Sequence, residues 1–102
     1  MIEEEAASMF HALSNADRLK VIRALVIAGP DGLSAGDIAE KVGASPSRAS
    51  FHLSALSDAG FVHKERQSRS LRYTVDFSRI GSLVTFLTDD CCNGSAQLKS
   101  CC

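Results

Sequence analysis

The sequence predicts a mainly α-helical fold that carries one β-hairpin, with its elements in the order ααααββα. Three observations predict it. Apolar residues recur at helical spacing, two segments rich in strand-forming residues flank a short polar turn, and Gly, Pro, Ser or Asn stands at the boundaries. The chain has 102 residues, 45% hydrophobic and 23% charged, which favours a single globular domain over a disordered chain.

The first two predicted helices are separated at Asn15. Residues 3–14 have apolar side chains at i, i+3, i+4 and i+7, namely Ala6, Met9, Phe10 and Leu13. A second helix is expected to start near Asp17 and run to about Ala28. Its expected buried side comprises Leu19, Ile22, Leu25 and Val26. The sequence Gly-Pro-Asp-Gly at 29–32 then predicts a loop.

Two further helices are expected on either side of a tight turn at Gly43 and Ala44. Ser34 is a good N-cap for a short helix that ends at Gly43. Ser45 is a second N-cap, followed by Pro46 at the first helical position, where a missing N–H does no harm. This fourth helix is expected to run to about residue 59, with its core side formed by Ala49, Leu53 and Leu56.

The end of the predicted domain is a hairpin and a last helix. Residues 61–65 and 71–75 are the expected strands, and 67–70 the turn. Ser78 is the expected cap of a helix with apolar Ile80, Leu83, Val84 and Leu87, which ends before two aspartates at 89–90. This order is that of a winged helix-turn-helix domain over residues 1–90, with residues 91–102 as a separate tail.

The fourth helix is the expected DNA-reading element, because a helix-turn-helix places its second helix in the major groove. Arg48 can read guanine or hold a phosphate. Phe51 can pack against a thymine methyl or belong to the core, and His52 can donate to phosphate or pack inside the domain. The candidate DNA-binding residues of this helix are Ser45, Ser47, Arg48, Ser50, Phe51, His52 and Ser54.

Positive charge is concentrated around the same helix and the hairpin. Residues 45–72 contain five Lys or Arg and two Asp or Glu, whereas the whole chain has a net charge of −1. Hairpin cations of a wing typically contact the phosphate backbone or the adjacent minor groove. The alternative is a hairpin kept soluble by its charge. The candidate wing residues are Lys64, Arg66, Arg69 and Arg72.

All four cysteines lie in the tail, at Cys91, Cys92, Cys101 and Cys102. Soft thiolates select soft ions. Trivalent arsenic or antimony takes three thiolates, which the first pair and one sulfur of the second can supply, because an eight-residue spacer closes cheaply. A methylated arsenic(III) species needs two. The alternatives are another soft metal such as cadmium, lead or zinc, a thiol redox switch, and a tail without function.

Three segments together resemble the ArsR/SmtB family of repressors: residues 15–19, 45–62 and 66–73, where Ser68 stands in place of the usual Gly. The resemblance covers roughly residues 5–88. It implies a homodimer joined by the first and last helices, a palindromic operator, and release of DNA when an inducer binds. Some arsenic-responsive members carry a terminal cysteine cluster, which implies As(III), Sb(III) or methylarsenite as inducer here.

Two metal sites known in that family lack their ligands in this chain. Residues 33–38 contain no cysteine where relatives have a Cys-x-Cys pair on the third helix, and residues 78–88 contain no His. The sequence therefore directs sensing to the tail. DNA binding itself is expected to require no cofactor.

The sequence argues against an enzyme and against a membrane protein. His11, His52 and His63 lie in different predicted elements, and the chain has no Gly-rich phosphate loop or hydrolase metal spacing. No apolar run approaches the roughly 20 residues needed to span a bilayer, and the acidic start is unlike a secretory signal, so we expect a cytoplasmic protein. The remaining alternative is a winged-helix protein-interaction module that does not bind DNA.

Overall fold

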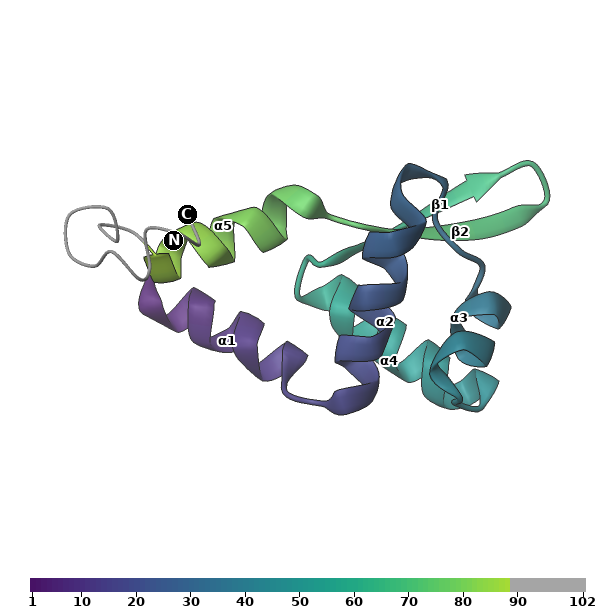
Figure 1. The fold of residues 1–102 in the computed structure, drawn as a ribbon, viewed down its shortest axis with the longest axis horizontal. Helices are drawn as coiled ribbons and strands as arrows, with labels where there is room; N and C mark the ends of the chain where they lie inside the picture. Colours follow the sequence, from purple (N-terminus) through teal and green to yellow (C-terminus); the bar gives the residue numbers. More distant parts are fainter. Residues whose placement is uncertain (89–102) are drawn as a thin grey trace.

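The computed structural model describes residues 1–88, and it has the predicted order of elements (Figure 1). The elements are α1 (Glu3–Leu13), α2 (Ala16–Ala28), a short 3-10 turn η1 (Gly29–Asp31), α3 (Ala35–Val42), α4 (Pro46–Asp58), β1 (Val62–Gln67), β2 (Ser70–Val75) and α5 (Phe77–Thr88). Helices α1 and α5 lie side by side at one end, the hairpin projects at the other, and α2, α3 and α4 lie between them.

Side-chain caps fix where four of the helices begin. Asn15 accepts from the backbone N–H groups at the start of α2, and Ser34 and Ser45 do the same for α3 and α4. The cap predicted for the last helix was wrong. Helix α5 begins at Phe77, and the carboxylate of Asp76 accepts from the backbone N–H of Arg79 at 2.9 Å. Aspartate and serine are equally good N-cap residues, so Asp76 and Ser78 were both compatible with the local sequence pattern.

The hydrophobic core forms where α1, α2, α3 and α4 meet one another and the base of the hairpin. Its largest fully buried side chains are Phe61, Met9, Leu25, Ile38, Leu53, Leu56 and Val21. The predicted buried side of α2 was partly wrong, since Leu19 and Val26 are exposed and Val21 is buried. Helix α2 is apolar around much of its circumference, so periodicity alone did not determine which side faces α3 and α4.

The hairpin is longer and its turn tighter than predicted. Strands β1 and β2 pair antiparallel from Val62 opposite Val75 to Gln67 opposite Ser70. The connection is therefore the two residues Ser68 and Arg69, and Ser68 adopts a positive φ of 57°. Tight hairpin turns need positive φ, which glycine adopts at no cost and serine at a small one. A serine at this position thus still closes the turn.

The base of the hairpin is tied to the helical body by backbone hydrogen bonds. Leu33 and Tyr73 exchange N–H···O bonds of 3.0 and 2.8 Å across an isolated bridge. Gly32 stands immediately before this bridge at φ 65°, and a Cβ at this position would collide with the carbonyl oxygen of Tyr73. The loop before α3 therefore fixes the hairpin relative to the helix-turn-helix.

Candidate nucleic-acid interface

Helices α3 and α4 form a helix-turn-helix with a left-handed residue in its turn. Gly43 adopts φ 71° and ψ 32°, and its backbone N–H donates to the last carbonyls of α3. Positive φ at this point favours glycine, since other residues incur a steric cost there. Ala44 follows, and the hydroxyl of Ser45 then accepts from the backbone N–H of Arg48, which starts α4 in a new direction. The turn is as short as the sequence predicts.

One side of α4 is buried and the other presents polar groups outward. Ala49, Leu53 and Leu56 lie in the core, as predicted. The exposed members of the predicted DNA-binding set are Ser45, Ser47, Arg48, Ser50, Phe51 and Ser54. Phe51 is 64% exposed, which favours the DNA-facing alternative for this residue over the core alternative. That these side chains contact DNA stays a prediction.

His52 is the member of the predicted set that the structure places inside the domain. Its side chain is only 8% exposed. The Nε atom of Arg18 donates to its Nδ1 at 3.2 Å, and its Nε2 lies 3.7 Å from the carboxylate of Asp17. The burial favours the packing alternative, because a side chain enclosed between α2 and α4 is not presented to a phosphate.

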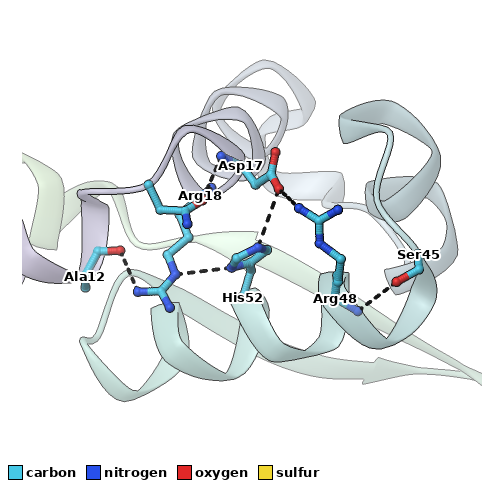
Figure 2. Close-up of polar contacts among 7 residues, drawn as sticks. Ala12, Asp17, Arg18, Ser45, Arg48 and His52 are labelled. Atoms are coloured by element: carbon cyan, nitrogen blue, oxygen red, sulfur yellow. Dashed lines mark hydrogen bonds and ion pairs between the residues drawn. The ribbon is translucent and has the colours of Figure 1, made fainter.

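Arg48 is exposed but not free, because an ion pair joins it to α2. Its Nη2 atom lies 2.5 Å from Oδ2 of Asp17 (Figure 2). No local signal in the sequence predicts Asp17 as its partner, since 31 positions separate the two residues. The first turn of α4 is therefore attached to the first turn of α2.

Arg18 links three helices at the same place. Its Nη1 donates to the carbonyl of Ala12 near the end of α1, and its Nε donates to His52 of α4 (Figure 2). Its guanidinium carbon also lies 5.6 Å from the centre of the Phe51 ring, within cation–π range. Arg18 lies in residues 15–19, one of the segments that resemble the repressor family. That resemblance is the sequence signal that could have indicated a structural role for Arg18. The contacts fix α4 relative to α1.

The predicted wing residues divide into two kinds. Lys64, Arg66 and Arg69 are exposed, and none of the three forms a salt bridge within residues 1–88. Arg72 is half-buried, and its guanidinium donates to the carbonyls of Asp31 and Gly32 at 3.3 Å each. Arg72 therefore holds the hairpin against the loop before α3, a structural task that the sequence analysis did not assign to it.

A second polar link connects the hairpin with α5. His63 Nε2 of β1 lies 2.7 Å from Oδ2 of Asp76, the cap of α5. The hydrogen bond from the Arg79 backbone N–H, and then that with His63, hold the pKa of Asp76 below its ordinary value of 3.8. Arg79 also donates from Nε to the carbonyl of Ala59 after α4. The start of α5 is thus attached both to the hairpin and to the residue that follows α4.

The predicted sensing residues Cys91, Cys92, Cys101 and Cys102 lie outside the described residues. Within residues 1–88, no three His, Cys, Asp or Glu side chains gather in a way that could hold a metal ion. In the same part of the chain, no helix is long and apolar enough to cross a membrane.

Comparisons with known proteins agree with this architecture. A family described as a helix-turn-helix domain matches residues 13–65, which run from the end of α1 into β1. A "probable mercury resistance operon repressor" from Streptomyces lividans is 32% identical over 98 residues, covering 96% of this chain and 76% of the relative.

Two solved structures are similar along almost the whole chain. An ArsR-like transcriptional regulator from Rhodococcus sp. RHA1 superimposes with a TM-score of 0.76 at 26% identity, covering 95% of this chain and 89% of the other. A homodimeric winged helix-turn-helix DNA-binding domain from Mycobacterium bovis, described as a possible ArsR-family regulator, has a TM-score of 0.66 at 25% identity and coverages of 91% and 86%. The chain therefore belongs to the ArsR family of winged helix-turn-helix transcriptional regulators, which are DNA-binding proteins and not enzymes.

Proposed function

We propose that the chain is a cytoplasmic homodimeric repressor that binds a palindromic operator through α4 and the wing, and that a thiophilic ion bound by its terminal cysteines releases it. The observation that carries the DNA-binding part is the outward polar side of α4, which a buried apolar side holds in place. The hairpin that follows α4 in the chain carries exposed cations, which suit phosphates. Membership in a family of DNA-binding regulators supports the same conclusion.

Dimerisation through α1 and α5 has support from an apolar surface. Phe10 is 41% exposed, Val84 51% and Leu87 58%, although each is a large apolar side chain. These three side chains line one groove together with Leu13, Leu19, Ile22, Phe61, Ile80 and Leu83. A second copy is the proposed occupant, because a twofold axis lets one such patch cover another. The two recognition helices would then be spaced by about 34–36 Å, one turn of DNA.

The proposed inducer is trivalent arsenic or antimony, bound by Cys91, Cys92 and one of Cys101 and Cys102. Three thiolates satisfy the pyramidal coordination of these ions, and soft donors favour them over hard cations. The first cysteine pair follows α5 closely in the sequence, so ion binding there can displace α5 and with it the spacing of the recognition helices. Mercury(II) is the second candidate, favoured by the similarity to a probable mercury resistance repressor.

Operator binding is tested with the DNA upstream of the chain's own gene in a gel-shift assay at several salt concentrations. We expect tight binding whose affinity falls steeply with salt, because phosphate contacts release counterions. Binding no tighter than to unrelated DNA would contradict the repressor and favour the protein-interaction module.

Induction is tested by titrating the reduced protein–DNA complex with arsenite, antimonite, methylarsenite, mercury(II), cadmium and zinc, and with an oxidant. We expect arsenite or antimonite to release the DNA at the lowest concentration. Cys92→Ser should abolish release while operator binding remains. The double variant with Cys91→Ser and Cys92→Ser should do the same. Cys102→Ser is the matched control, since Cys101 can replace its sulfur. Release that persists in the double variant would exclude the tail as the sensor.

A further inference from the structure

Arg48 stands where a recognition helix meets base edges, yet one of its nitrogen atoms is already engaged. It lies in the first turn of α4, and 64% of its side chain is exposed. Recognition helices contact bases mainly through their N-terminal residues. Its Nη2 is held by Asp17, and no other side-chain partner of Arg48 occurs within residues 1–88. A guanidinium has five N–H donors, so the rest remain available to DNA.

Asp17 is held at its backbone and flanked at its carboxylate. Its backbone N–H donates to the side chain of Asn15 at 2.8 Å. Its carboxylate lies 3.7 Å from Nε2 of the buried His52 (Figure 2). Arg18 donates to Nδ1 of His52, so a neutral ring carries its proton on Nε2, facing Asp17. The side chain of Asp17 is 20% exposed and that of Arg48 is 64% exposed, so the more enclosed carboxylate orients the more exposed guanidinium.

We propose that Asp17 is a specificity-determining residue of the DNA interface, which holds Arg48 in position to read a guanine and reduces its attraction to phosphates. The proposal rests on the operator binding proposed above. It assigns a task to a residue of α2, outside the helix-turn-helix and the wing.

The physical reason is that the two kinds of DNA contact depend on different properties of arginine. Phosphate attraction depends on charge and is independent of sequence. Asp17 offsets that charge and repels a nearby phosphate. Guanine recognition depends on where two N–H donors stand relative to O6 and N7. A held guanidinium keeps those donors in place, so the ion pair weakens non-specific binding more than it weakens binding to the correct base.

The test is selection of duplexes from a random-sequence pool by the full-length wild type and by Asp17→Asn. We expect the wild type to enrich sites with a guanine at one position of each half-site, and Asp17→Asn to lose that preference. The ratio of specific to non-specific affinity should fall about tenfold, the discrimination of one good base contact. On unrelated DNA, the salt slope of Asp17→Asn should steepen by about one per subunit.

Two variants separate this role from a structural or general charge effect. Asp58→Asn removes the same charge at the far end of α4 and should leave the guanine preference intact. Arg48→Ala removes the exposed partner of Asp17 and should lose the same preference. In the Arg48→Ala background, Asp17→Asn should change the preference no further, because Asp17 acts through Arg48.

The outcomes distinguish the two proposals. If Asp17→Asn selects the same guanine with an unchanged affinity ratio, Asp17 has no role in specificity. If Asp17→Asn changes the preference equally in the Arg48→Ala background, it does not act through Arg48, and the inference is again wrong. If the wild type itself enriches no sequence, operator binding fails, and the inference fails with it.

Discussion

Helix α4 presents one cation outward, Arg48, and the wing presents three, Lys64, Arg66 and Arg69, but the structure secures the two elements very differently. Helix α4 is capped by Ser45, buried along one side through Leu53, and joined to α2 by the Asp17–Arg48 and Arg18–His52 contacts. The wing is buried only at its base, and its strands are exposed toward the tip. Arg66 and Arg69 form no salt bridge within residues 1–88.

This difference matches two tasks in DNA recognition. Reading a base edge needs donors at fixed positions, which a helix packed on a core supplies. Attraction to phosphates needs only charge within reach, and mobile exposed side chains supply it without fixed positions. A perturbation of α4 should therefore damage folding or sequence preference, whereas a perturbation of the wing tip should lower affinity for all sequences alike.

The largest expected effect comes from the packed side of α4. Leu53→Ala should lower the free energy of unfolding by about 2–5 kcal/mol, because Leu53 is 2% exposed and its removal leaves a cavity. The same change on the wing, Leu71→Ala, should lower the free energy of unfolding by about 0.5 kcal/mol or less. The reason is that the Leu71 side chain is already 39% exposed. Urea unfolding followed by circular dichroism measures both. Equal losses would show that the wing is packed as firmly as α4.

A smaller effect is expected from the charge at the wing tip. Arg69→Ala should weaken binding to operator and to unrelated DNA by the same factor, and reduce the salt slope by about one per subunit. Lys20→Ala is the control, since it removes the same charge from an exposed position on α2. Fluorescence anisotropy at several salt concentrations provides the slopes. A loss confined to the operator would mean that Arg69 reads sequence.

The smallest effect concerns Asp76, where the wing joins α5. Its pKa is lower in the folded chain than its ordinary value of 3.8, so its contribution to stability is present above that pH and is lost as pH falls through the folded pKa. The stability difference between wild type and Asp76→Asn should therefore shrink as the pH is lowered below about 3.8. Urea unfolding from pH 6 to pH 3 measures it, with Asp58→Asn as control. A difference that stays constant with pH would contradict this role.

Much of the fold followed from signals a few residues long. Ser34, Ser45 and Gly43 set the limits of α3 and α4 as predicted, because caps and positive-φ positions act within one turn of chain. The errors arose where two local choices were equally good. Asp76 and Ser78 are both acceptable caps, and α2 has apolar residues on more than one side, of which packing selected Val21 and left Leu19 exposed.

By itself, the sequence determined the order of elements, the helix-turn-helix, the exposed residues of α4 other than His52, and the family. Tertiary structure alone decided that His52 is enclosed, that Arg72 holds the hairpin, and that Asp17 holds Arg48. These contacts join residues 31 to 41 positions apart. Such partners meet only through the packing of whole elements on one another, which periodicity, caps and charge runs do not encode.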